Sequence, residues 1–217
     1  MDFTAARLNM VENQIRTNRI ADEAVIAALA DVPREVFVPK PMRGFAYVDD
    51  DLDVGGGRYL VEPLVLARLL QGAAIKAGDL VLNIGDATGY VTAVISRLAQ
   101  TVVTIESDGD WCTRATAGLG ELGIDNAAVV QGPPDQGYAA QAPYDVIVFA
   151  GAVADIPQAI CRQLADGGRL VAVVDAGSGL GKGTLVVRVG DTFGRRVLFD
   201  ASTPVLPGFR SGAGFVF

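Results

Sequence analysis

From residue 79 onward, short runs rich in β-branched residues alternate with helical stretches, and this alternation limits the fold more than any other feature. The β-rich runs lie at 79–84, 101–106, 127–130, 145–150 and 169–174, and the helical stretches at 91–98, 111–122 and 156–164. Strands that alternate with helices form a parallel sheet covered on both faces. The last runs, at 184–189 and 195–200, flank the turn GDTFG and predict an antiparallel hairpin at one edge of the sheet. We therefore expect an α/β fold with a doubly wound, mostly parallel, Rossmann-like sheet and a C-terminal antiparallel hairpin.

The first 78 residues follow other patterns. Apolar residues three and four apart predict two short amphipathic helices, at 5–18 and 22–29. The segment 32–57 holds several prolines, the acidic run Asp49-Asp50-Asp51 and three consecutive glycines, so it is typical of a long irregular loop, and such loops usually carry function. Pro63 fits the first turn of a further helix. The 217 residues thus predict one compact unit, with an N-terminal helical cap and loop segment at 1–78 and a Rossmann-like core with its hairpin at 79–217.

Composition excludes several classes of function. The chain has no histidine, which excludes Ser-His-Asp and Cys-His hydrolases and histidine-ligated metal sites. Its two cysteines cannot form a four-sulfur zinc site, so we expect no metal. The formal net charge of −7 repels a phosphate backbone, so nucleic acid is not an expected partner. The N-terminus lacks the pattern of a secretory signal and no apolar run reaches the ~18 residues of a membrane span, so we expect a cytoplasmic protein without a membrane partner.

A glycine loop, Gly85-Asp86-Ala87-Thr88-Gly89, follows the first predicted strand of the core and precedes a helix. Ligands of doubly wound sheets bind at the carboxyl ends of the strands. Glycines let the backbone approach a ligand closely, and the following helix offers free N–H groups. Glu106 ends the next strand, about 20 residues further on, which is the spacing of a carboxylate that binds two ribose hydroxyls. The loop and Glu106 together predict a nucleoside ligand.

The loop differs from two common nucleotide-binding motifs. A dinucleotide fingerprint, G-x-G-x-x-G, requires glycine where this chain has Ala87, so NAD is disfavoured. No G-x-x-x-x-G-K-[ST] motif precedes a helix, so a P-loop is absent from the sequence. A nicotinamide oxidoreductase is kept as a hypothesis only because Glu106 fits a ribose.

Longer motifs extend over most of the chain, from about Met10 to Phe209. The most specific is Val32-Pro33-Arg34-Glu35-Val36-Phe37-Val38-Pro39, at its fixed distance from the glycine loop. The others are Met10-Val11-Glu12-Asn13-Gln14, Ala46-Tyr47-Val48-Asp49, Val81-Leu82-Asn83-Ile84-Gly85 through Gly89-Tyr90, Val103-Thr104-Ile105-Glu106, Ala142-Pro143-Tyr144-Asp145, and Gln163-Leu164-Ala165-Asp166-Gly167-Gly168-Arg169-Leu170. In these motifs the chain resembles the protein-L-isoaspartate O-methyltransferases.

The resemblance implies a methyltransferase that uses S-adenosylmethionine to methylate the side-chain carboxylate of isoaspartyl residues in damaged proteins. It also implies a monomer whose partner is a protein or peptide that carries such a carboxylate. This reaction suits a chain without histidine, because the attacking carboxylate is already ionised at neutral pH and needs no general base. The rate would come from holding the two reactants close and aligned, and from stabilising the bound carboxylate.

The chain departs from the family pattern at positions that the resemblance marks as functional. Val61 stands where the family has an active-site Ser or Thr, Asn83 replaces the acid at the end of the first strand, and Gly132-Pro133-Pro134 replaces a Gly-Asp-Gly near adenine. A hydrogen bond to a charged group is worth about 1.5–3 kcal/mol. Loss of the hydroxyl at Val61 alone therefore predicts roughly ten- to a hundredfold weaker catalysis. Two hypotheses address the losses: Asp86 substitutes for the missing acid near the methionine ammonium, and Arg58 pairs with a substrate carboxylate.

We therefore predict an S-adenosylmethionine-dependent carboxyl O-methyltransferase. The residues predicted on the catalytic and substrate side are Asp49, Arg58 and Val61, and the predicted cofactor-binding residues are Asn83, Gly85, Asp86, Gly89, Glu106, Gly132 and Pro133. The alternative is a diverged, non-catalytic relative that keeps the fold as a binding or regulatory module. The substitutions at Val61, Asn83 and Pro133 support that alternative.

Overall fold

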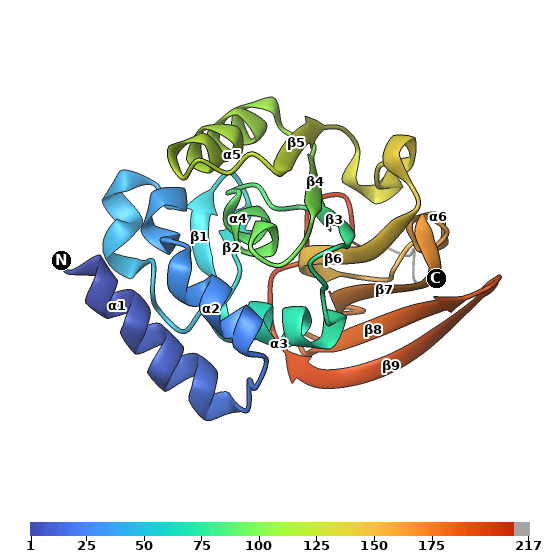
Figure 1. Cartoon of the computed structure of the whole chain (residues 1–217), viewed down its shortest axis with the longest axis horizontal. Helices are drawn as coiled ribbons and strands as arrows, with labels where there is room; N and C mark the ends of the chain where they lie inside the picture. The colour runs from blue at the N-terminus through green and yellow to red at the C-terminus, as the bar shows by residue number, and fades with distance from the viewer. Residues whose placement is uncertain (211–217) are drawn as a thin grey trace, which may run out of the picture.

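The computed structural model describes residues 1–210 and has at its centre a seven-stranded sheet in the order β5-β4-β3-β6-β7-β8-β9 (Figure 1). The first five strands in that order are parallel, and β8 and β9 are antiparallel at one edge. This arrangement confirms the predicted sheet and its C-terminal hairpin. The strands are β3 (Leu80–Ile84), β4 (Thr101–Glu106), β5 (Ala127–Gln131), β6 (Tyr144–Val153), β7 (Leu164–Val174), β8 (Gly181–Val189) and β9 (Thr192–Ala201).

Side chains alternate between the two faces of the sheet along each strand. Different elements cover the two faces. One face, with Val81 and Val102, packs against the N-terminal helices and α3 (Pro63–Ala73), α4 (Tyr90–Ser96) and α5 (Gly109–Glu121). The other face, with Leu82 and Ile105, is covered by α6 (Gln158–Cys161), the 3₁₀ turns η5 (Pro134–Gln136) and η6 (Ala139–Gln141), and the segment 203–209. The second cover contains no long helix within residues 1–210.

The helix expected at 156–164 is the main error in the predicted core. Only four of its residues, Gln158–Cys161, are helical, and β7 already begins at Leu164. Its apolar spacing fits a helix as well as a turn followed by a strand. Pairing of Leu164 with Tyr144 of β6 decides for the strand. The predicted helix that begins at Pro63 is confirmed, as are the helices after β3 and β4.

The N-terminal residues form two helical stretches, as predicted. The first runs without a break through α1 (Phe3–Met10), a π-helical turn η1 (Val11–Ile15) and a 3₁₀ turn η2 (Arg16–Asn18). The second is α2 (Glu23–Asp31), and Asp22 caps it by accepting hydrogen bonds from the backbone N–H groups of Ala24 and Val25. Apolar side chains of both stretches belong to the same hydrophobic cluster as Val81 of the sheet. No helix within residues 1–210 is both long and apolar enough to cross a membrane.

The segment expected to be an irregular loop contains more structure than predicted. It forms two 3₁₀ turns, η3 (Arg34–Phe37) and η4 (Lys40–Phe45), and then a small antiparallel hairpin of β1 (Leu52–Gly55) and β2 (Arg58–Leu60). The three consecutive glycines are the turn of this β1–β2 hairpin, with φ values of +95°, +63° and +70° at Gly55, Gly56 and Gly57. Left-handed backbone favours glycine, so this run is a turn signal. Figure 1 shows the hairpin on the side of the sheet where the N-terminal helices lie.

Candidate functional site

The carboxyl ends of β3, β4 and β5 bring several predicted cofactor residues together. Gly85 directly follows β3, and its N–H donates to the carbonyl of Ile105 in β4 at 3.1 Å. Gly132 directly follows β5, and its N–H donates to the carbonyl of Glu106 at 3.0 Å. Parallel strands that end at one edge thus place Gly85, Glu106 and Gly132 next to one another, at the edge where doubly wound sheets bind ligands. Pro133 follows Gly132 and contributes no N–H donor.

Asp86 is turned into the protein and holds the glycine loop. It is 3% exposed, and its carboxylate accepts hydrogen bonds from the N–H groups of Gly89 (2.9 Å) and Thr92 (2.7 Å) and from the hydroxyls of Thr88 and Thr92. Burial raises the pKa of Asp86, and these four hydrogen bonds oppose the rise. Because its acceptor positions are filled by the loop and by the first turn of α4, this carboxylate positions the loop.

Asn83 extends the same buried network under the loop. Its side chain is completely buried, and Nδ2 donates to the hydroxyl of Thr92 at 3.1 Å and to Asp86 at 3.3 Å. Its Oδ1 has no hydrogen-bond partner within the described part of the chain. Asn83 thus acts on the site through Asp86, as a support of the loop. The cofactor contacts predicted for both residues stay predictions, and the hydrogen bonds of both side chains run to the loop, to the first turn of α4 and to each other.

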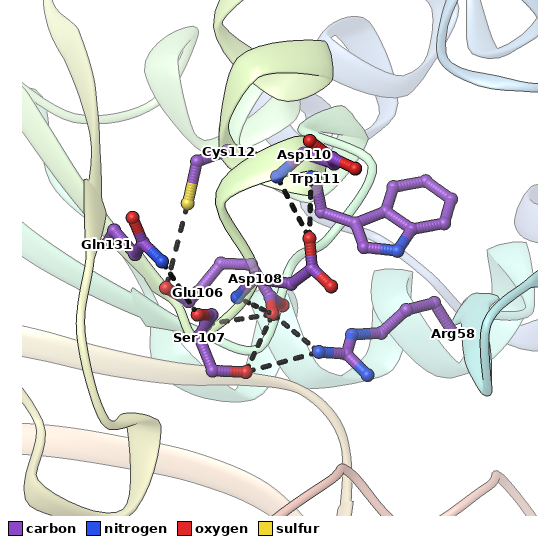
Figure 2. Close-up of polar contacts among 8 residues, drawn as sticks. All are labelled: Arg58, Glu106, Ser107, Asp108, Asp110, Trp111, Cys112 and Gln131. Carbon is purple, nitrogen blue, oxygen red and sulfur yellow. Dashed lines mark hydrogen bonds and ion pairs between the residues drawn. The ribbon is translucent and has the colours of Figure 1, made fainter.

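Glu106 differs from Asp86 in what holds it. It is 2% exposed, and its Oε1 accepts hydrogen bonds from the N–H of Ser107 (2.8 Å), the N–H of Asp108 (3.0 Å) and the hydroxyl of Ser107 (3.0 Å). Figure 2 shows these donors converging on one oxygen, with Asp108 in turn capping α5. No hydrogen bond from residues 1–210 reaches its other oxygen, Oε2. Glu106 therefore has one oxygen tied to its own loop and a second without a protein donor.

Arg58 reaches Glu106 from the β1–β2 hairpin. Its Nη2 lies 2.7 Å from Oε1 of Glu106 and 3.2 Å from the hydroxyl of Ser107, and the two side chains of the ion pair are 11% and 2% exposed (Figure 2). The sequence predicted Arg58 on the substrate side and Glu106 on the cofactor side. The structure joins them directly, which sequence reasoning missed. Nothing in the sequence signals this contact, because the two residues belong to elements that are distant along the chain.

A small crevice lies beside this ion pair. The crevice is lined by Asp51, Arg58, Val61, Gly85, Gly151 and Leu206, with neighbouring residues of 203–207, and its volume is about 10 Å³. That volume is at most the space of a single water molecule. The side chain of Leu206 covers both glycines: a Cβ atom at Gly85 or at Gly151 would lie 2.7 or 2.8 Å from its methyl groups. The sequence does not predict Leu206 at the site, because no motif marks the segment 203–207.

Three acids on the substrate side differ in their positions. Asp49, predicted to act there, is exposed and does not line the crevice. Asp51 lines it instead, and its Oδ1 accepts from the N–H of Glu62 and the hydroxyl of Thr203, each at 2.9 Å. Burial, together with the neighbouring Asp49, Asp51 and Asp50, raises the pKa of Glu62 to about 7. The role predicted for Asp49 stays a prediction, and Asp51 is a further acid that the structure places at the crevice wall.

The motif residues that precede the hairpin hold its base. Arg34 is completely buried, and its guanidinium donates to the carbonyls of Ala46 and Val61, each at 2.6 Å, and stacks on the ring of Tyr90. Gln14 donates to the carbonyl of Tyr47 at 3.0 Å. These contacts fix Val61 at the crevice with its side chain buried. The longest sequence motifs thus anchor the backbone around the site.

Comparisons with known proteins agree with this architecture. Residues 5–191 match the family described as Protein-L-isoaspartate(D-aspartate) O-methyltransferase (PCMT). A relative from Rhodopseudomonas palustris (strain HaA2), named Protein-L-isoaspartate O-methyltransferase 1, is 41% identical over 174 residues, which is 80% of this chain and 71% of the relative. A Protein-L-isoaspartate O-methyltransferase from Methanoculleus marisnigri is 42% identical over 168 residues, which is 77% of this chain and 76% of the relative.

Solved structures show the same likeness. A structure named protein-L-isoaspartate O-methyltransferase superposes with a TM-score of 0.81 at 25% identity, over 93% of this chain and 66% of that chain. A Plasmodium falciparum structure in complex with S-adenosyl-L-homocysteine superposes with a TM-score of 0.79 over 92% of this chain and 97% of that chain. At 18% identity, the second likeness is one of fold.

Proposed function

Because the chain belongs to the protein-L-isoaspartate O-methyltransferase family, we propose that it transfers the methyl group of S-adenosylmethionine to the side-chain carboxylate of isoaspartyl residues in proteins or peptides. The observation that carries most weight is the meeting of Gly85, Glu106 and Gly132 at one edge of the sheet, beside the partly buried Arg58. That arrangement offers a carboxylate for a ribose and a cation for a substrate carboxylate. Methyl transfer from S-adenosylmethionine to a carboxylate, the reaction of the family, would use both groups.

The donors and acceptors at this edge suit S-adenosylmethionine. Oε2 of Glu106 receives no hydrogen bond from the described residues 1–210, and it can accept one from a ribose hydroxyl. Gly85 and Gly89 have φ values of +81° and +88°, which favour glycine, and a Cβ atom at Gly89 would lie 3.0 Å from Ala115, so this glycine lets the loop pack closely on α5. Gly132 lies beside Glu106, where the resemblance places adenine. Arg58 and Leu206 both line the crevice at Gly85, so we infer that cofactor binding at this glycine displaces the β1–β2 hairpin or the segment 203–207.

When bound, S-adenosylmethionine supplies a methyl group on a sulfonium. The acceptor carboxylate forms a new O–CH₃ bond as the C–S bond breaks, and the sulfur leaves as a neutral thioether. No proton moves in this step, which fits a chain without histidine. The residues of this chain contribute by position: Arg58 orients the carboxylate, Glu106 holds the ribose, and burial of Val61 and Leu206 excludes water from the reacting atoms.

We infer that the working unit is a single chain, as the family resemblance implies, and that the protein acts in the cytoplasm. A sedimentation measurement and a cell-fractionation experiment test these two points. The methyl acceptor is tested by mass spectrometry, which should detect a mass gain of one methyl group on an isoaspartyl peptide and none on the same peptide with ordinary aspartate.

Substitution of Val61 by threonine tests the reaction at the crevice. Threonine has the shape of valine, so Val61→Thr adds a hydroxyl where the structure buries a methyl group at the crevice wall. We expect methylation to rise about tenfold or more, because a hydrogen bond to a charged group is worth about 1.5–3 kcal/mol. Val61→Ala, which changes the side chain without adding a hydroxyl, is the matched control. An increase with alanine but not with threonine would contradict the assignment of this wall to the acceptor.

A second candidate function also has an observation behind it. With a crevice of about 10 Å³, the chain in this conformation serves equally as a non-catalytic binding module that keeps the fold. Calorimetry separates the two functions. Heat on addition of S-adenosylhomocysteine supports the methyltransferase, and absence of heat with S-adenosylhomocysteine, S-adenosylmethionine and NAD supports the module.

A further inference from the structure

The contact between Arg58 and Glu106 brings together two groups that the proposed reaction needs separately. Arg58 must meet the acceptor carboxylate, and Glu106 must meet the ribose. In this structure the guanidinium instead occupies Oε1 of Glu106 at 2.7 Å, with both side chains nearly buried. A carboxylate that binds two ribose hydroxyls uses both of its oxygens, and Arg58 already occupies Oε1, so Arg58 and a ribose compete for Glu106.

The guanidinium is only partly satisfied where it lies. Nη2 is shared between Glu106 and Ser107, whereas the buried Nε has no hydrogen-bond partner within residues 1–210. A buried donor without a partner costs free energy. A second carboxylate that met Nε would remove this cost, and side-on binding through Nε and Nη2 is a geometry that arginine offers to carboxylates.

The β1–β2 hairpin that carries Arg58 is held more firmly at its base than at its tip. Its strands pair with each other and with no strand of the main sheet. Arg34 holds its base at the carbonyl of Val61, whereas at its tip Gly56 lies close to Trp111: a Cβ atom there would be 3.5 Å from the indole Nε1. The three glycines at the tip have no side chains to pack. Release of Arg58 therefore frees the tip while the base stays in place.

The charges around the crevice make Arg58 the group on which an anionic acceptor depends. Among the described residues that line the crevice, Arg58 is the cation and Asp51 the anion. Glu62, beside them, has its pKa raised to about 7 partly by Asp49, Asp51 and Asp50, which marks this side as negative. An acceptor carboxylate approaching the closed crevice meets this negative charge while the guanidinium is engaged with Glu106.

We propose that Arg58 exchanges partners: it binds Glu106 in the free enzyme, is displaced by the cofactor, and then binds the acceptor carboxylate, so that the cofactor must bind before the acceptor. This inference rests on the proposed function. It makes Arg58 a specificity residue for an anionic acceptor and, at the same time, a competitor of the cofactor. Removal of Arg58 should therefore strengthen cofactor binding and weaken binding of the acceptor.

The test measures both affinities in Arg58→Gln. We expect its Kd for S-adenosylhomocysteine, from calorimetry without peptide, to fall about tenfold because the competing group is gone. Its KM for an isoaspartyl peptide should rise about tenfold or more, because the acceptor loses a charged partner. If Arg58 only supported the fold, its substitution would weaken the binding of both S-adenosylhomocysteine and the peptide. Arg58→Lys, which keeps the charge but not the forked geometry, should tighten S-adenosylhomocysteine binding and restore part of the peptide KM.

Trp111 gives a readout that is independent of catalysis. It is the one tryptophan of the chain and lies beside the tip of the hairpin, so S-adenosylhomocysteine should shift its emission in the wild type. The spectrum of free Arg58→Gln should already resemble that of the ligand-bound wild type. Arg97→Gln is the matched control, since Arg97 forms an exposed pair with Asp31 at 2.8 Å, away from the crevice, and should match the wild type throughout.

The outcomes separate this inference from the proposed function. If the wild type binds S-adenosylhomocysteine and Arg58→Gln binds it equally or more weakly, the exchange of partners is wrong while the methyltransferase stands. An unchanged peptide KM in Arg58→Gln would have the same consequence. If neither the wild type nor any variant binds S-adenosylhomocysteine or methylates the peptide, the proposed function itself is wrong and the inference is overturned with it.

Discussion

The site contains two buried carboxylates at the ends of neighbouring strands, and they are held in different ways. Asp86, after β3, is bound by donors of its own loop, of the helix that follows and of Asn83 in β3. Glu106, at the end of β4, is bound by its own loop on one oxygen and by Arg58 from a separate hairpin on that same oxygen.

The difference teaches which carboxylate serves structure and which serves a ligand. A group whose partners are all local cannot release them without unfolding its loop. A group whose partner comes from a separate, glycine-tipped hairpin can exchange that partner for another. Both side chains are almost equally buried, 3% and 2% exposed, so burial alone does not distinguish them.

The largest expected effect is a loss of stability when Asp86, the structural carboxylate, is removed. Asp86→Ala leaves the backbone N–H groups of Gly89 and Thr92 without their buried acceptor. We expect the free energy of unfolding to fall by about 3 kcal/mol or more, since each buried donor left unpaired costs about 1–3 kcal/mol. Urea unfolding measures it. A loss below about 1 kcal/mol would show that the loop does not depend on Asp86.

A smaller effect on stability, with a large effect on binding, is expected for the other carboxylate. Glu106→Gln keeps an acceptor for the N–H groups of Ser107 and Asp108 and loses the ion pair with Arg58. The free energy of unfolding should fall by about 1–2 kcal/mol. The affinity for S-adenosylhomocysteine should fall about ten- to a hundredfold. Urea unfolding and calorimetry on one preparation test both, and an affinity equal to that of the wild type would remove Glu106 from the cofactor site.

The smallest effect concerns a third carboxylate, Glu62, which receives no hydrogen bond on its side chain from residues 1–210. Its pKa is raised to about 7 in the folded chain, mainly by burial, from an ordinary value of 4.5. The folded chain therefore binds this proton more tightly than the unfolded chain, so the contribution of Glu62 to stability is present below about pH 4.5 and is lost as the pH rises to about 7. Glu62→Gln should remove this decline, and unfolding curves of both proteins at pH 5 and pH 8 measure it. Parallel pH profiles would contradict the raised pKa.

The sequence predicted those parts of the molecule that depend on local pattern. The alternation of β-rich runs and helices gave the sheet, and the spacing from Gly85 to Glu106 placed both at one edge. Contacts between distant segments carry no local signal, so Leu206 over Gly85 and Arg58 on Glu106 were missed. The hairpin of β1 and β2 was missed for another reason: its strands are four and three residues long, too short for an alternating pattern to emerge.

Leu206 has a practical consequence for anyone who screens compounds against this protein. Its side chain belongs to the hydrophobic cluster on one face of the sheet and also covers the glycines of the crevice. A compound that displaced it would expose an apolar side chain whose burial is worth about 1.5–3 kcal/mol. That loss offsets part of the melting-temperature gain that binding normally produces. Since the melting-temperature gain follows the net affinity, compounds that leave Leu206 in place are expected to rank highest in a thermal-shift screen.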